Sequence, residues 1–384
     1  MIRNAFIMQI THELSAQLEQ LRQQHRYRTL VQRQAQHLQF DSNDYLGLSM
    51  HPRVKAAYAE GVQQYGASSG ASPLVSGYQA PHAYLRQQLA QWLEREDALL
   101  FSSGFAANQS TLQTLGSQYQ RIVLDKLSHA SLIDGVRHFK HWKRFRHNDV
   151  AHAQELLLPN VANLLVTESV FSMDGDHAPL NQLAELPADV WIDDAHSIGI
   201  SGESGRGAGA TLSAAQAPLL TITFGKGLGV MGAAIVGSSV MTDYLMNQAR
   251  DFIYSTAMPA AQAQAVSASI NVVQSAEGES LRQRLRDNIQ YFREQCVAQG
   301  LPIGANQHAI QTLILGSEER VIAWGQSLRA LNIYCGIIRP PTVPQGSSRL
   351  RITVTAAHST ADIDALVTAL IITRDLVEKA NVTA

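Results

Sequence analysis

The sequence predicts an α/β protein with one large, mostly parallel sheet and a smaller C-terminal α+β domain. Two observations support this prediction. Between about residues 97 and 237, short apolar runs alternate with helical or loop segments, which is typical of a parallel sheet covered on both faces. After Pro259, a long helical region leads to further strand-like runs and two helical segments, which we assign to the smaller domain.

The predicted strands and domains have the following limits. Strands of the large sheet are expected at 98–101, 121–125, 163–168, 189–193, 219–224 and 233–237. The C-terminal domain is expected to contain strands at 311–315, 334–338 and 349–354 and helices at 318–331 and 359–382. We expect an N-terminal helical segment at 1–39, the large domain at 40–275 and the small domain at 276–384.

The N-terminal segment shows a helical pattern within residues 11–36. Leu14, Leu18 and Leu21 recur at the spacing of one helix face, so this stretch predicts an amphipathic helix that lies on the main body. Three arginines, Arg22, Arg26 and Arg28, would by default belong to its solvated face.

Composition narrows the class of protein and its partners. The 384 residues include 45% hydrophobic and 16% charged residues, and the formal net charge is −2. This balance argues against nucleic acid or an anionic membrane as the main partner. Cys296 and Cys335 lie far apart and form no CxxC, which suits a reducing compartment. With no signal-peptide pattern in residues 1–10, we expect a cytoplasmic protein.

Lys226 is the first candidate functional residue. It follows an apolar run, 219–224, and stands between Gly225 and Gly227. Such a strand end places one amine in a tight loop, and the glycines let a ligand approach the backbone closely. A desolvated lysine with a lowered pKa readily forms Schiff bases. The alternative is a surface lysine in a glycine-rich turn, and this stretch alone leaves both interpretations open.

Three further signals lie at expected carboxyl ends of strands, where ligands of such sheets bind. Ser103–Asn108 forms a strand-to-helix turn suited to a phosphate. His129 follows the strand that ends at Asp125, and its flat imidazole could stack on an aromatic ring. Asp193 ends an apolar strand, where a carboxylate needs a cation or strong hydrogen bonds. Each signal alone is compatible with a purely structural role.

Two other kinds of site do not fit these residues. No pair of histidines or carboxylates has the spacing of a metal site, so no metal is expected. The Gly-Lys-Gly stretch lacks the spacing of a phosphate-binding P-loop. One cofactor, pyridoxal 5'-phosphate (PLP), uses all four groups together: an amine, a carboxylate for its ring nitrogen, an anion cradle and a stacking partner.

The sequence resembles the α-oxoamine synthases, PLP-dependent enzymes with an aminotransferase-like fold (fold type I). The resemblance runs from about residue 35 to residue 358. It rests on nine stretches in the same order, namely SNDYLGLS (42–49), LVSGY (74–78), FSSGFAANQ (101–109), LSHASL (127–132), TESVFSMDGD (167–176), DDAH (193–196), TFGKGLGVMGAA (223–234), YSTAMP (254–259) and IRPPTVPQGSSRLRIT (338–353). The stretches FSMDGDHAPL and IRPPTVP favour the members that condense L-alanine with a pimeloyl thioester.

The resemblance implies a role for each matching residue. Lys226 would carry the cofactor as a Schiff base, Asp193 would pair with its ring nitrogen and His196 with its ring oxygen. His129 would stack on the ring and act in catalysis with Lys226 and Asp193. Backbone or hydroxyl contacts to the cofactor are expected from Gly104, Phe105, Ser172 and Thr223. Substrate contacts are expected from Arg22, Asn43, His129, Thr342 and Arg351, the last as clamp of the amino-acid carboxylate.

The resemblance also implies partners and alternatives. It implies a homodimer with sites at the subunit interface, where loop 66–78 would serve the partner's site, and an acyl group carried by CoA or by a carrier protein. Glycine-using α-oxoamine synthases share every cofactor residue, and a non-catalytic PLP-binding protein on the same fold is an alternative of another class. Two departures from the family occur at Pro73, which is often Arg or Gly, and at Ser197-Ile198, which replace Gly-Thr. Arg26 and Arg28 compete with Arg22 for its role.

Overall fold

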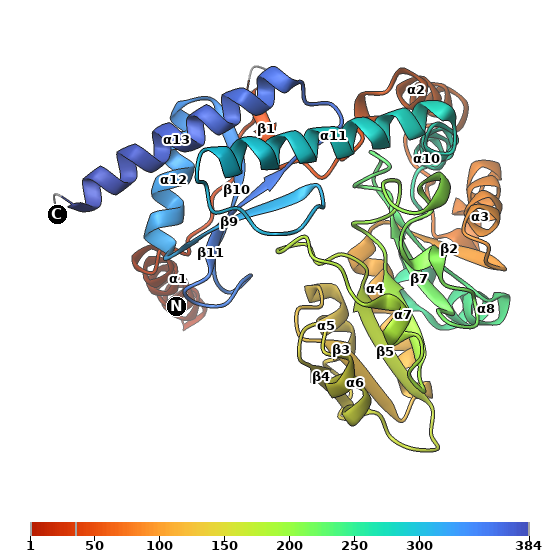
Figure 1. The fold of residues 1–384 in the computed structure, drawn as a ribbon. Helices are drawn as coiled ribbons and strands as arrows, with labels where there is room; N and C mark the ends of the chain where they lie inside the picture. The colour runs from red at the N-terminus through yellow and green to blue at the C-terminus, as the bar shows by residue number, and fades with distance from the viewer. Residues whose placement is uncertain (1, 35–36, 383–384) are drawn as a thin grey trace. The chain divides into compact units, whose positions relative to one another are not determined.

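The computed structural model describes residues 2–34 and 37–382, which form two compact units (Figure 1). The large unit comprises residues 43–287 and 355–357. The small unit comprises the described residues of 1–42, 288–354 and 358–384. The domain limits expected near residues 40 and 276 remain predictions, and each unit is described by itself.

The sheet of the large unit confirms the predicted fold class. Among the described residues it has seven strands in the order β2-β8-β7-β6-β5-β3-β4. Their bounds are β2 Asp97–Phe101, β3 Arg121–Asp125, β4 Trp142–Phe145, β5 Asn163–Glu168, β6 Asp189–Asp193, β7 Leu219–Thr223 and β8 Ala233–Gly237. From β4 to β7 every neighbouring pair is parallel, and β8 runs antiparallel to both β7 and β2. The carboxyl ends of β3, β5, β6 and β7 therefore meet at one edge.

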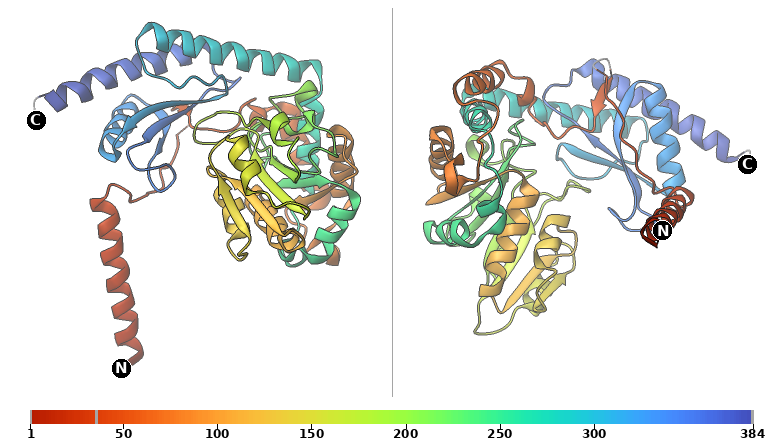
Figure 2. Two further views of the ribbon diagram at one scale, coloured as in Figure 1. Left: turned by 60° about the horizontal axis from the view of Figure 1, so that its bottom comes forward. Right: turned by 180° about the vertical axis from the view of Figure 1, so that it is seen from behind.

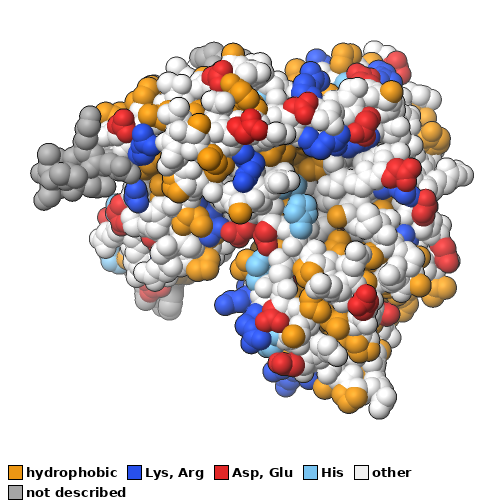
Figure 3. Space-filling view, in the orientation of Figure 1, with side chains coloured by type: hydrophobic (Ala, Val, Ile, Leu, Met, Phe, Trp, Pro, Cys, Tyr) orange, Lys and Arg blue, Asp and Glu red, His pale blue; other side chains and the backbone are white. Residues whose placement is uncertain are grey.

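Strand β4 was not predicted because its sequence, WKRF, carries charge where the other strands are apolar. It is an edge strand, and its Lys143 and Arg144 are exposed. Figure 3 shows Lys and Arg side chains gathered over β4 and the neighbouring helices α5 (Ala130–Val136) and α6 (Val150–Leu156). Charged side chains on an edge strand discourage pairing with another chain.

Helices pack against both faces of this sheet, as Figures 1 and 2 show. The helices of the large unit not yet given are α2 Pro52–Tyr65, α3 Ala80–Trp92, α4 Gly104–Leu115, α7 Leu180–Leu183, α8 Ser239–Gln248, α9 Arg250–Tyr254 and α10 Ala260–Val273. The sheet interior is mostly apolar at its centre, where Val190, Trp191 and Ile192 are buried. The continuous apolar runs read from the sequence are the consequence of burial on both faces.

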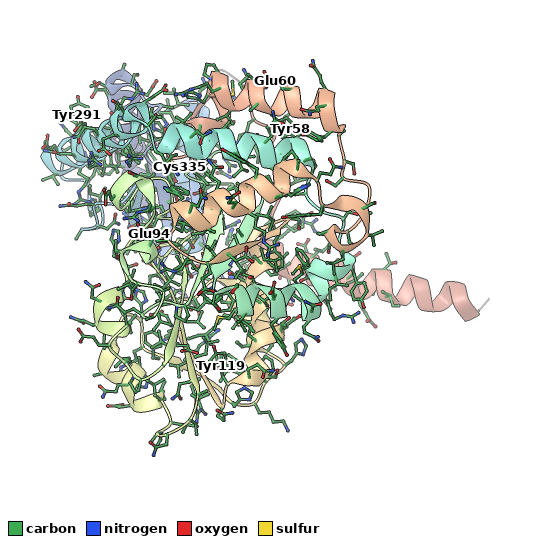
Figure 4. All side chains as sticks on the ribbon, turned by 90° about the vertical axis from the view of Figure 1, so that its right-hand side faces the viewer. Tyr58, Glu60, Glu94, Tyr119, Tyr291 and Cys335 are labelled. Carbon is green, nitrogen blue, oxygen red and sulfur yellow. The ribbon has the colours of Figure 1, made fainter. Side chains whose placement is uncertain are left out.

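The amino-terminal ends of the strands lie at the opposite edge of the sheet from the candidate site. There the hydroxyl of Tyr119, labelled in Figure 4, donates to Asp189 at the start of β6 over 2.9 Å. Burial and the Asp189 carboxylate raise the pKa of Tyr119. Tyr119 is buried and Asp189 is exposed, and this pair lies at the edge of the sheet that carries none of the predicted site residues.

The small unit contains a four-stranded sheet, counted over the described residues, in the order β1-β10-β11-β9. Its strands are β1 Leu38–Phe40, β9 Ile310–Gly316, β10 Ile333–Ile338 and β11 Ser348–Thr353, and its helices are α1 Ile2–Gln23, α12 Glu318–Ala330 and α13 Thr360–Val382. Helix α11 (Ala276–Ala298) begins in the large unit and ends in the small one. The three predicted C-terminal strands and both helices are confirmed, whereas β1 was missed because it is only three residues long.

Helix α1 corrects one expectation. It runs from Ile2 to Gln23 instead of 11–36 (Figure 2), and Leu14, Leu18 and Leu21 are exposed. The prediction that this leucine face packs on the main body is therefore wrong for the single chain. The helix ends before His25, which adopts a left-handed backbone with φ 55°. A positive φ at a residue other than glycine interrupts a right-handed helix.

Candidate active site

A cavity of about 240 Å³ lies in the large unit, at the carboxyl ends of the central strands and the start of α4. It brings together every predicted cofactor residue except Ser172, together with the predicted substrate residue Asn43. The lining residues are Asn43, Ser103, Gly104, Phe105, Asn108, His129, Glu168, Asp193, Ala195, His196, Thr223, Gly225, Lys226, Met231 and Gly232. Residues from seven separate segments thus converge, as the sheet topology predicts.

Lys226 lies in a tight loop directly after β7. The loop is closed by a hydrogen bond from the amide of Gly229 to the carbonyl of Lys226 (2.9 Å). Glycine is required at 227, because a Cβ there would come within 2.2 Å of the carbonyl oxygen of Ile198. Gly229 has φ 65°, a conformation that other residues adopt at a cost. The loop of Ser197-Ile198, where the sequence departs from the family, is therefore the surface against which the lysine loop packs.

Asp193 ends β6 as an almost fully buried carboxylate, 5% exposed. One of its oxygens accepts from the side-chain amide of Asn108 (2.6 Å) and the other from the backbone amide of Ala195 (3.0 Å). Asn108 is oriented in turn, because its own oxygen accepts from the hydroxyl of Thr221 (2.7 Å). The two donors therefore fix the orientation of the Asp193 carboxyl group. Asn108 had been noted only as the end of the Ser103–Asn108 turn, not as a site residue. Its spacing, one helical turn after Gly104, could have revealed it.

Glu168 is a second buried carboxyl group that sequence reasoning missed. It is 3% exposed and pairs in register with Asp193 across β5 and β6. Its oxygen accepts from the backbone amide of His129 (2.6 Å). Burial and the neighbouring Asp193 carboxylate raise the pKa of Glu168 well above its usual range. This shift favours the protonated, neutral form of Glu168. Its position as the last residue of a predicted strand was the available signal.

The neutral state of Glu168 gives a first testable prediction. Glu168→Gln keeps an uncharged group of the same size and an acceptor for His129, so its free energy of unfolding should stay within about 1 kcal/mol of the wild type near pH 5. An acid whose pKa is raised by folding loses stability as pH rises above its unfolded value. The wild type should accordingly become less stable relative to Glu168→Gln between pH 5 and 8, as measured by urea unfolding of the cofactor-free protein. A difference that does not change with pH would show that Glu168 is ionised in the fold.

His129 is held as a neutral ring at the N-terminus of α5. Its Nδ1 lies 3.3 Å from the backbone amide of Ser131, which donates to it, and 2.8 Å from the Ser131 hydroxyl. Burial and the nearby Lys226 ammonium lower the pKa of His129. With Nδ1 accepting, the single ring proton of the neutral imidazole is on Nε2. Phe105 packs edge-on against the ring, with centroids 6.2 Å apart.

His196 and Thr223 complete the predicted cofactor residues of the cavity. The hydroxyl of the fully buried Tyr45 lies 2.6 Å from Nδ1 of His196 and fixes the orientation of its ring. The hydroxyl of Thr223 donates to the carbonyl of Ala195 (3.3 Å). Ser172 is not among the lining residues; it lies in the turn that follows β5, between Phe171 and Asp176.

The remaining predicted substrate residues belong to the small unit. Arg22 is exposed on α1 and pairs with Glu19 of the same helix. Arg28, one of its two competitors, donates to the hydroxyl of Thr342 (3.2 Å). Arg351 lies on β11, is 6% exposed and donates to the hydroxyl of Thr353 (3.0 Å). Within this unit Arg28, not Arg22, therefore accompanies Thr342.

Comparison with known proteins defines the class first. Residues 35–370 match the family described as aminotransferase class I and II, and the chain belongs to this family. Among its curated relatives are the 8-amino-7-oxononanoate synthases of Yersinia pestis (strain Pestoides F) and Yersinia pseudotuberculosis (serotype IB, strain PB1/+). Each is 47% identical over 350 residues, which is 89% of this chain and 91% of the relative. The resemblance seen in the sequence is thereby confirmed.

Solved structures agree with these relatives. A serine palmitoyltransferase from S. paucimobilis, solved with bound PLP and myriocin, has a TM-score of 0.84 at 28% identity and covers 89% of this chain and 88% of its own. The 8-amino-7-oxononanoate synthase of Francisella tularensis has a TM-score of 0.78 at 27% identity, with coverage of 90% and 100%.

Proposed function

We propose that the protein catalyses the PLP-dependent, decarboxylative condensation of L-alanine with a pimeloyl thioester, giving 8-amino-7-oxononanoate, carbon dioxide and a free thiol for biotin synthesis. The observation that carries the proposal is the convergence of Lys226, Asp193 and His129 on one cavity at the carboxyl edge of the sheet. The substrates are inferred from the relatives that are 47% identical and named 8-amino-7-oxononanoate synthase.

The cavity fits PLP on features of this chain. The N-terminus of α4 supports an anion, because its first amides are not bonded within the helix. Gly104 keeps that approach open, since a Cβ there would lie 2.5 Å from the Thr223 side chain. Asp193 supplies a buried negative charge suited to a protonated ring nitrogen, and Lys226 supplies the amine.

The residues of the cavity would then have separate roles in the reaction. PLP, when bound, supplies an electron sink for the α-carbon of the amino acid. Lys226 would hold the aldehyde and, once released, move the α-proton of alanine. Asp193 would keep a proton on the ring nitrogen, because Asn108 and Ala195 orient its carboxyl group within the cavity. The neutral ring of His129 would stack on the cofactor, and His196, oriented by Tyr45, would bond to the ring oxygen.

We further propose a homodimer in the cytoplasm. The loop 66–78 and the segment near residue 254 expose large apolar side chains, including Leu74, Val75 and Tyr254, and the rim residue Met231 is also exposed. A second copy would cover such a surface. Pro73 lines a separate apolar cavity of about 100 Å³ in this region.

Both cysteines, including Cys335 in Figure 4, are buried and unpaired, as suits a reducing compartment. Among the described residues, no helix is long and apolar enough to span a membrane.

The decisive experiment mixes the purified protein, PLP, L-alanine and pimeloyl-CoA and follows release of the free thiol. We expect thiol release that depends on both substrates and a product of the mass of 8-amino-7-oxononanoate. Release with glycine and not with L-alanine would instead identify a glycine-using α-oxoamine synthase. PLP binding without thiol release, from CoA or from a pimeloyl-carrier protein, would identify a non-catalytic PLP-binding protein.

The proposed carboxylate clamp gives a second prediction. Arg351→Lys should raise the KM for L-alanine about 10- to 100-fold and leave PLP binding unchanged, because a lysine cannot reproduce the planar, two-point contact of arginine with a carboxylate. The matched control is Arg349→Lys on the same strand, whose guanidinium donates to the carbonyl of Ser347. Equal KM values in wild type and Arg351→Lys would exclude the clamp.

A further inference from the structure

A half-buried histidine outside the cavity is held between two carboxylates. Nδ1 of His147 lies 2.9 Å from Asp125, and Nε2 lies 2.7 Å from Asp176. Asp125 is the last residue of β3, and Asp176 belongs to the turn after β5. His147 itself follows β4, so the contact joins three segments of the large unit. Phe171 also packs against the imidazole. The two ring centroids are 4.4 Å apart and the ring planes are nearly perpendicular.

The hydrogen bonds require a doubly protonated ring. Asp125 also accepts from the backbone amides of Leu127 (2.8 Å) and Asn148 (2.9 Å), so its carboxyl oxygens face hydrogen-bond donors. Asp176 accepts in addition from the side-chain amide of Asn148 (2.9 Å). A neutral imidazole could donate to only one of the two carboxylates, whereas an imidazolium donates to both. In keeping with this geometry, the two carboxylates raise the pKa of His147 to about 10 despite its burial.

Both carboxylates anchor turns that carry proposed site residues. Asp125 starts the turn that ends at His129, since its side chain and its carbonyl accept from the amides of Leu127 and Ser128. Asp176 closes the turn of Ser172, because its carbonyl accepts from the amide of Phe171 (3.0 Å). The imidazole of His147 is thus the bridge between the base of the His129 turn and the base of the Ser172 turn.

We infer that His147 is a positioning residue, whose charged ring fixes the turn of His129 against the turn of Ser172 and so shapes the cofactor cavity. The roles of His129 and Ser172 rest on the proposed function. The bridge itself does not, because its contacts are all within the described large unit. Among the described residues no group of three or more histidine, cysteine or acidic side chains could hold a metal ion, so the three residues act through charge and hydrogen bonds.

The test changes the net charge of the cluster formed by His147, Asp125 and Asp176. The wild-type cluster carries one positive and two negative charges. His147→Gln leaves the buried Asp125 and the half-buried Asp176 without a cation. The double variant His147→Gln/Asp176→Asn restores the original net charge with hydrogen-bonding amides. His138→Gln is the matched control, because His138 is exposed. Two quantities are measured in each PLP-loaded protein: hydrogen exchange of the peptides covering 125–131, 145–149 and 170–177, and the dissociation constant of PLP.

In His147→Gln, we expect exchange in those three peptides and the dissociation constant of PLP to rise about 10- to 100-fold, the effect of losing a charge-assisted contact. The double variant should return both to within about threefold of wild type. Loss that the double variant does not repair would mean that the ring acts by packing alone, and an unchanged His147→Gln would mean that no bridge operates. Either result overturns the inference.

A second variant decides the matter if His147→Gln does not fold. In Asp176→Asn the ring can become neutral, donating to Asp125 through Nδ1 and accepting from the introduced amide. The pKa of His147, followed by NMR of ring-labelled histidine, should then fall toward the ordinary value for histidine. An unchanged pKa would overturn the inference. None of these readouts uses alanine or a thioester, so their failure is separate from failure of the proposed reaction.

Discussion

Lys226→Ala is expected to abolish covalent attachment of PLP. It should also lower turnover by about 10²–10⁴-fold, the contribution usual for one acid–base group. The reason is geometric. Lys226 is the lysine that lines the cavity, and its loop is fixed by Gly227 against Ile198 and by Gly229 against residues 48–49. No other lining residue offers an amine. Replacing the side chain leaves Asp193 and the start of α4 in place, so non-covalent binding of PLP should persist.

The measurement is borohydride reduction of the PLP-loaded protein followed by peptide mapping. The wild type should carry the reduced adduct on Lys226, and Lys226→Ala should carry none. Lys140→Ala serves as the matched control, because Lys140 is exposed near α5 in the same unit. An adduct on another lysine in the wild type, or full turnover by Lys226→Ala, would contradict the assignment of the amine.

The strands that position the site were accessible from sequence because they are buried on both faces. The runs 121–125, 163–168, 189–193 and 233–237 coincide with β3, β5, β6 and β8. Continuous burial removes polar residues from a strand, so the limits of the apolar run are the limits of the strand. The edge strand β4 does not form such an apolar run, because Lys143 and Arg144 face solvent within it. The sequence therefore did not predict β4.

Site residues could be predicted where the residue type itself indicates a chemical role. Residues that only orient another side chain could not be predicted in this way. Lys226 and His129 stood out because an amine between glycines and a histidine after a strand are unusual. Asn108 and Glu168 have only weak local signals, a spacing of one helical turn after Gly104 and a place at the end of a strand. Their contacts with Asp193 and His129 join segments far apart in the sequence, so the sequence did not single them out. Resemblance to relatives likewise left Arg22, Arg26 and Arg28 open as the substrate arginine. In the structure helix α1 ends at Gln23, and Arg28 donates to Thr342.

Asp193→Asn is the second substitution for which we expect a large effect. Asp193 accepts from Asn108 with one oxygen and from Ala195 with the other, and an asparagine has a single acceptor oxygen. One donor is therefore left unsatisfied, which should cost about 1–3 kcal/mol of folding stability. The variant should remain folded and bind PLP, because Lys226 and the start of α4 are unchanged. What it loses is the negative charge that would hold a proton on the ring nitrogen.

The consequence should appear at the α-carbon of the substrate and not in binding. Exchange of the α-hydrogen of L-alanine with deuterated water, followed by NMR, should slow by about 10²–10³-fold, the usual loss when one preorganised electrostatic group is removed. Glu168→Gln is the matched control, since Glu168 pairs in register with Asp193 but is held neutral. Its exchange rate should stay close to that of wild type, because the substitution changes no charge. Wild-type exchange in Asp193→Asn would mean that Asp193 is a structural carboxylate, held by Asn108 and Ala195 for the sake of the fold alone.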